Sequence, residues 1–113
     1  MHEYSIVQAL LDQCESYAKV NDAEKITRVE IKVGVMSGVE PHLLSTAFET
    51  FREHTLCDSA ELVVHIQPIV VTCRSCHATN ALERAHYCCP ECESTDVRVD
   101  EGEDLLLMRL EME

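Results

Sequence analysis

The chain has few of the residues that aromatic cores and nucleic-acid surfaces need. Its 113 residues include no tryptophan, and aromatic residues make up only 4% of the total. The core must therefore rely on Ile, Val, Leu and Ala. Nine basic residues stand against 21 acidic ones, which gives a formal net charge of −12. Because phosphate backbones are bound through Lys and Arg, this charge argues against a nucleic-acid partner.

Long apolar runs and familiar catalytic motifs are missing as well. No run approaches the roughly 20 apolar residues that cross a bilayer as a helix. The start, Met1-His2-Glu3-Tyr4, lacks the basic and apolar regions of a signal peptide. We therefore expect a cytoplasmic protein with no membrane partner. Since neither an HExxH motif nor a Gly-rich phosphate loop occurs, the sequence does not indicate an enzyme.

Apolar periodicity predicts two helices. Between residues 6 and 18 apolar side chains recur every three or four positions, which places them on one stripe of a helix. Ser5 is a possible cap for this helix, although the residues before it can equally be helical. Pro41 suits the first turn of a second helix, where its missing N–H does no harm. The buried side of that helix is predicted to be Leu44, Ala47, Phe48 and Phe51.

Alternation of apolar and polar residues predicts the strands. Residues 28–33 alternate as a half-buried strand does, and a second strand places Leu62, Val64 and Ile66 toward the core. This strand continues through residues 69–71. The stretches 97–100 and 105–112 are predicted as two more strands. Together they indicate one small mixed sheet built from both ends of the sequence.

Two CxxC units interrupt this pattern. Cys73 and Cys76 form the first, Cys89 and Cys92 form the second, and residues 77–88 separate them. Two such units supply the four thiolates of the tetrahedral site that Zn²⁺ favours, with no position left open for a substrate. The segment between them has few large apolar residues, so metal binding is expected to supply its folding free energy. Paired spacing of this kind favours structural zinc over a redox dithiol.

The other cysteines and two histidines are less informative. Cys88 would give the wrong spacing with the last cysteine of the cluster, so Cys89 is assigned to the site. His77 and His86 flank the cluster and are either ordinary exposed histidines or partners that make the site sensitive to acid. Cys14 is predicted to be a small core residue on the first helix, and Cys57 a loop cysteine without a partner.

The fold class that follows is α+β. We expect a small mixed sheet with two helices, formed by residues 1–71 and 97–113. A zinc-ribbon-like loop domain, residues 72–96, is inserted into it.

The N-terminus offers a second metal site. The amine of Met1, the backbone nitrogen of His2 and its imidazole can form two fused chelate rings, and Glu3 can supply an oxygen. Nitrogen-rich sites of this kind favour Ni²⁺ or Cu²⁺ over Zn²⁺. Taken alone the signal is weak, because a histidine near the start of a chain is common.

Three landmarks together resemble the HypA family of nickel chaperones, which act in [NiFe]-hydrogenase maturation. They are the opening MHEYS, the segment GVMSGVEP at residues 34–41, and the late pair CRSC and CPEC. The likeness runs through nearly the whole chain in the same order. One departure is Glu93, which follows the last cysteine where glycine is frequent.

The resemblance implies specific roles. It places transferred nickel on His2, with Glu3 and the Met1 amine nearby and Glu40 as a tentative further ligand, and structural zinc on the four cysteines. It also implies a GTPase partner, HypB, and delivery of nickel to the hydrogenase large-subunit precursor, with urease maturation as a further possibility. The alternatives left open are a structural zinc-ribbon adaptor and a nucleic-acid-binding zinc module.

Overall fold

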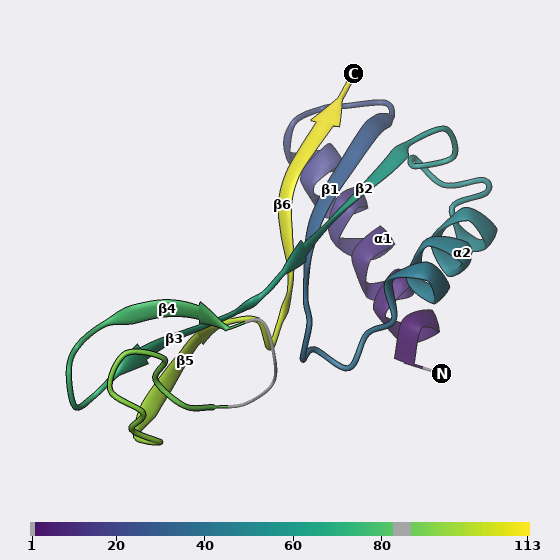
Figure 1. Ribbon diagram of the computed structural model, residues 1–113. Helices are drawn as coiled ribbons and strands as arrows, with labels where there is room; N and C mark the ends of the chain where they lie inside the picture. Colours follow the sequence, from purple (N-terminus) through teal and green to yellow (C-terminus); the bar gives the residue numbers. More distant parts are fainter. Residues whose placement is uncertain (1, 83–86) are drawn as a thin grey trace.

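The computed structural model describes residues 2–82 and 87–113, and for His2 it describes the backbone alone. The chain forms two units, each with a three-stranded sheet (Figure 1). The first unit contains α1 (His2–Val20), β1 (Ile26–Gly34), α2 (Pro41–Phe51), β2 (Glu61–Gln67) and β6 (Leu105–Met112). The second unit contains β3 (Ile69–Cys73), β4 (Thr79–Leu82) and β5 (Val97–Glu101).

The two units lie end to end, so the molecule is elongated. Its extents are 52 × 28 × 17 Å and its radius of gyration is 17.1 Å. A compact domain of this length would have a radius of about 13 Å. The helices and the second unit therefore occupy opposite ends of the molecule, as Figure 1 shows.

The first sheet confirms the predicted α+β class. Its strand order is β2-β1-β6, with β1 parallel to β2 and antiparallel to β6, so the sheet is mixed and built from both ends of the sequence. The prediction that residues 69–71 and 97–100 extend this sheet is wrong. They pair with one another in the second sheet, whose order is β4-β3-β5. Pro68, which has no N–H to donate, separates β2 from β3 at the point where the chain changes sheets.

The helices cover one face of the first sheet. The stripe of α1 buries Val7, Leu10, Leu11, Cys14 and Ala18, and α2 adds Leu44 and Phe48. They pack against the inward side chains of β1, namely Val29, Ile31 and Val33. Burying one such side chain contributes about 1.5–3 kcal/mol. Within the described residues, no helix has the length and apolar character needed to span a membrane.

The two predicted lone thiols meet in this core. Cys14 and Cys57 are both buried, at 0% and 1% exposure, and their side chains contact each other. The Cys57 thiol, and then burial, raises the pKa of Cys14. Cys14 is a core residue as predicted. The prediction that Cys57 has no partner is wrong, because the turn after α2 folds back over α1.

Two glycines set the junction between the units. A Cβ added to Gly34 would lie 2.3 Å from the carbonyl oxygen of Gly102, a distance that real side chains do not reach. Gly102 has a φ of +109°, and a Cβ there would lie 2.7 Å from the Cα of Ile69. The backbones are joined across this contact, since Met36 N–H donates to Gly102 O at 2.8 Å. Only glycine allows so close an approach.

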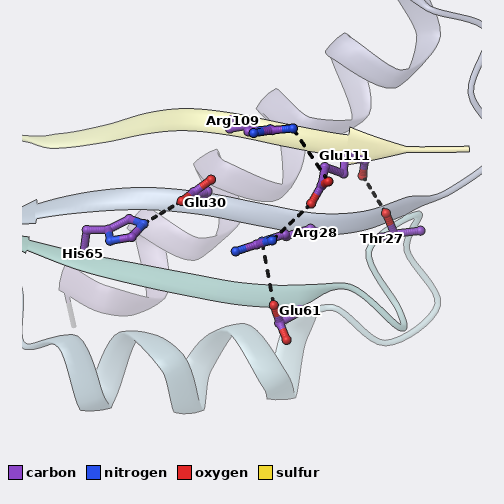
Figure 2. Close-up of polar contacts among 7 residues, drawn as sticks. All are labelled: Thr27, Arg28, Glu30, Glu61, His65, Arg109 and Glu111. Atoms are coloured by element: carbon purple, nitrogen blue, oxygen red, sulfur yellow. Dashed lines mark hydrogen bonds and ion pairs between the residues drawn. The ribbon is translucent and has the colours of Figure 1, made fainter.

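The outer face of the first sheet carries a charged layer (Figure 2). Arg28 lies between two carboxylates, 3.7 Å from Glu61 and 3.5 Å from Glu111. Next to it, His65 Nε2 lies 2.6 Å from Glu30 Oε1. Opposite charges on neighbouring strands stabilise a sheet pair by fractions of a kcal/mol each. The helices cover only the other face of the sheet, and these charged side chains remain at least partly exposed to solvent.

The charged layer predicts a pH dependence of stability. The hydrogen bond from His65 lowers the pKa of Glu30 below its ordinary value, and Arg28 and Arg109 act in the same direction. A carboxyl group with a lowered folded-state pKa stabilises the fold above its ordinary pKa, and this contribution is lost as pH falls through the folded-state pKa. We expect Glu30→Gln to lose less stability than the parent chain between about pH 5 and pH 3.

Urea titrations across this pH range measure the difference. Glu53→Gln, at an exposed position in the turn after α2, serves as the control and should follow the parent. Identical acid slopes for the parent and Glu30→Gln would show that the pair contributes nothing.

Candidate metal centre

Four sulfur atoms converge at the far end of the second unit. The thiols of Cys73, Cys76, Cys89 and Cys92 all lie within 4.8 Å of one another. Cys73 ends β3, while Cys89 and Cys92 come from the segment between β4 and β5. Among the described residues, this is the group of metal-ligating side chains that the fold brings together.

The sulfur spacing fits a tetrahedral zinc site. Cys73 Sγ lies 3.5 Å from Cys92 Sγ, and Cys76 Sγ lies 3.6 Å from Cys89 Sγ. A Zn–S bond of about 2.3 Å implies neighbouring sulfurs about 3.8 Å apart in a tetrahedron. An all-thiolate set suits Zn²⁺ and leaves no position for a substrate.

The two CxxC units have the same backbone geometry. In the first, Cys73 N–H donates to Ala78 O at 2.9 Å, and His77 N–H donates to Cys73 O at 3.0 Å. In the second, the bonds from Cys89 to Ser94 and from Glu93 to Cys89 are both 2.8 Å. Each loop turns through a residue with positive φ, His77 at 66° and Glu93 at 64°. Glycine would adopt this conformation without strain, whereas His77 and Glu93 adopt it with a side chain.

Backbone N–H groups prepare the first cysteine for a cation. Cys73 Sγ accepts hydrogen bonds from Ser75 N–H at 3.3 Å and Cys76 N–H at 3.4 Å. The Cys76 N–H lowers the pKa of the Cys73 thiol to about 6, with burial opposing it and the Ser75 N–H adding to it. The thiolate is the form that binds a metal, so these bonds favour the ligating state.

Cys88, His77 and His86 are the other possible metal ligands near the cluster in sequence. The Cys88 thiol donates to Glu93 O at 3.3 Å and is not one of the four converging sulfurs. His77 is exposed and likewise lies outside the group of four. His86 falls in residues 83–86, outside the described part of the chain.

Sequence reasoning missed two further features. Ser75 and Ser94 hydroxyls meet at 3.1 Å and link the two loops, and the four-residue strand β4 is too short to show alternation.

The second unit carries no free arginine among the residues that the structure describes. Arg74 pairs with Asp96 at 3.1 Å, and Arg98 pairs with Asp100 at 2.7 Å. A surface that binds nucleic acid needs unpaired basic side chains. This pairing disfavours the nucleic-acid alternative.

Of the candidate nickel ligands, the structure describes the side chains of Glu3 and Glu40, both in the first unit. Met1 and the side chain of His2 are outside the described residues. Glu3, in the first turn of α1, reaches the start of α2, where its Oε2 accepts a hydrogen bond from Glu40 N–H at 3.4 Å. The Glu40 side chain caps α2 by accepting from Leu43 N–H at 2.6 Å. The structure thus places the Glu3 carboxylate at the backbone of Glu40.

An aromatic contact holds this arrangement in place. The rings of Tyr4 and Phe51 pack edge to face with centroids 4.1 Å apart. Such pairs contribute about 0.5–1.5 kcal/mol beyond the area they bury. Tyr4 therefore fixes the first turn of α1 against α2, a role that the sequence alone did not reveal.

Comparisons with known proteins agree with this geometry. The model of the family described as "HypA: Hydrogenase/urease nickel incorporation, metallochaperone, hypA" matches residues 1–112. A hydrogenase maturation factor HypA from Shewanella sp. (strain MR-7) is 58% identical and covers 100% of this chain and 96% of its own length. The protein of the same description from Aquifex aeolicus is 43% identical, covering 100% and 98%.

Solved structures give the same result. The solution structure of the Ni metallochaperone HypA from Helicobacter pylori is 36% identical, with a TM-score of 0.74, covering 97% of this chain and 96% of that one. A second structure, "Solution structure of HypA protein", is 37% identical with a TM-score of 0.77, covering 99% and 96%. The resemblance inferred from the motifs is confirmed. The chain belongs to the HypA family of hydrogenase/urease nickel-incorporation metallochaperones.

Proposed function

We propose that this chain binds Ni²⁺ at its N-terminus and delivers it to the hydrogenase large-subunit precursor. His2, Glu3 and the Met1 amine bind the ion, and Glu40 stands close enough to assist. The observation that carries the proposal is the contact between Glu3 and the start of α2 at Glu40. It brings two carboxylates to the end of the chain where the amine and the imidazole lie in sequence.

The start of a helix suits such a site. The first N–H groups of an α-helix have no acceptor within the helix, so the His2 nitrogen can lose its proton to solvent and bind a metal without breaking a helical hydrogen bond. Nitrogen donors completed by oxygen favour Ni²⁺ in tetragonal geometry. The ends of chains also open at low cost in free energy, which helps a carrier to release its cargo.

Zinc has a different role in this proposal. Cys73, Cys76, Cys89 and Cys92 hold Zn²⁺, whose bonds supply folding free energy on the order of 10 kcal/mol to a unit with a small apolar core. Residues 72–96 are then the zinc-binding domain, and residues 1–71 and 97–113 the nickel-binding domain. Strands β3 and β5, which pair with each other in the second sheet, connect the two domains.

Partners supply what the chain lacks. The sequence has no phosphate-binding loop, so GTP hydrolysis in the delivery cycle belongs to HypB. The family description also names urease, and urease maturation proteins are proposed as further partners. The proposed location of this cycle is the cytoplasm, and the chain itself catalyses no reaction.

Native mass spectrometry with one equivalent of Ni²⁺ tests the nickel site. We expect the parent chain to retain one zinc and one nickel, and His2→Ala to retain zinc alone, because the imidazole anchors both chelate rings. His54→Asn is the matched control. His54 is exposed in the turn after α2 with a φ of 65°, which Asn tolerates. Equal nickel retention in His2→Ala and the control would show that His2 does not bind the nickel ion. A structural adaptor would then be the better reading.

Glu40 can be tested separately as a cap and as a ligand. Glu40→Ala removes the acceptor for Leu43 N–H, and we expect the free energy of unfolding to fall by about 1 kcal/mol. Glu40→Gln keeps an acceptor oxygen but removes the negative charge. If Glu40 assists nickel binding, the Gln variant loses nickel affinity at nearly unchanged stability, measured by titration calorimetry and thermal unfolding. Unchanged affinity in the Gln variant would limit Glu40 to capping.

The zinc site predicts a local response to metal loss. In Cys76→Ser, or after treatment with a chelator, amide signals of the second unit should lose dispersion in heteronuclear NMR spectra while those of α1 and β1 persist. Cys88→Ser is the matched control, because its thiol is not one of the four that converge. Zinc loss in the control, or an unchanged spectrum after chelation, would contradict the assignment.

A further inference from the structure

An apolar groove opens beside the proposed nickel site. It has a volume of about 220 Å³ and is lined by Val33, Gly34, Val35, Val39, Pro41 and Ile66. These residues come from the ends of β1 and β2, from the segment that follows β1, and from the start of α2. In Figure 1 these parts of the chain lie at the lower edge of the first unit. Pro41 directly follows Glu40, so the groove adjoins the candidate ligands.

The groove exists because α2 begins too late to cover the end of the sheet. Leu62 and Val64 of β2 pack against the core, where α2 contacts the strand. Ile66 is the next residue on the same side of β2 but remains 53% exposed. Val35 is 50% exposed on the neighbouring segment. The apolar layer thus continues past the helix into solvent, although the sequence predicted that Ile66 faces the core.

Acidic residues border the groove on two sides. On one side lie Glu3 and Glu40, joined at 3.4 Å. On the other side lies the turn between β5 and β6, held against the groove by the bond from Gly34 N–H to Asp104 O at 2.9 Å. This turn also contains Glu103, and Glu101 at the end of β5 accepts through Oε2 from the Gln67 side chain at 3.3 Å.

We propose that this groove docks the nickel-accepting protein, through a segment that places an apolar side chain in the groove and basic side chains against its acidic border. The inference rests on the proposed delivery function. Because nickel passes by ligand exchange, the ligands of carrier and acceptor must meet, and the acceptor must therefore cover the start of α1 and the adjoining groove. Apolar contacts within a polar rim are the usual form of a protein interface.

The charge of the border selects this occupant over a second copy of the chain. Two copies docked through the groove would bring acidic borders together in a protein whose net charge is already −12. Facing like charges oppose association, whereas opposite charges steer partners together and fix their register. A basic apolar segment meets both requirements of the surface.

The test measures the affinity of the hydrogenase large-subunit precursor for the zinc-loaded chain. Ile66→Gln keeps the size of the side chain but removes its apolar character, and we expect about tenfold weaker binding, as for a central interface residue. Glu103→Lys should also weaken binding and reduce its sensitivity to salt. Val20→Gln is the matched control, since Val20 is 82% exposed at the opposite end of α1.

Nickel retention measured on the same variants separates this proposal from the proposed function. We expect Ile66→Gln and Val20→Gln to hold one nickel, as the parent does. Docking at the groove is overturned if Ile66→Gln binds the precursor as tightly as the control, or if the parent does not bind it. It is also overturned if sedimentation shows a dimer of the parent that Ile66→Gln disrupts. Where the parent does bind the precursor, loss of nickel transfer in His2→Ala would still support the delivery function.

Discussion

The contact between Gly34 and Gly102 is the constraint on which the rest of the structure depends. It allows the end of β1 to lie against the turn between β5 and β6, where any side chain would collide with backbone. The chain crosses this point twice, at Pro68 and at Gly102, as it enters and leaves the second unit. Because β2 and β6 flank β1, the chain leaves the first sheet from one edge strand and returns to it through the other.

Much of the fold and of the four-cysteine site could be predicted because each rests on local patterns. Alternation in β1 and the apolar stripe of α1 report which side chains are buried, and CxxC spacing reports which thiols converge. The division into two sheets could not be predicted in this way. Residues 69–71 are apolar like β2 and are separated from it by Pro68 alone. Their partners in β5 are set by the crossing at the glycines, a contact between residues far apart in sequence.

The closeness of Glu40 to Glu3 could not be predicted from the sequence for a similar reason. A glutamate before a proline reads as a helix start, but its closeness to Glu3 depends on how α1 and α2 pack, which Tyr4 and Phe51 fix through their rings. The same packing decides where α2 begins over the sheet, and so leaves Ile66 exposed. In this protein the contact between Glu3 and Glu40 and the position of the apolar groove both follow from one helix–helix contact.

The parallel pairing of β1 with β2 has a practical result for anyone who wishes to attach the molecule to a surface. Parallel neighbours finish at the same edge of a sheet, so Gly34 and Gln67 lie together, with the first turn of α1 beside them. Glu113 lies at the opposite edge, bonded to Lys25 through the backbone. A tether or fluorophore joined at Glu113 therefore leaves the edge that carries Glu3 and Glu40 facing the solution.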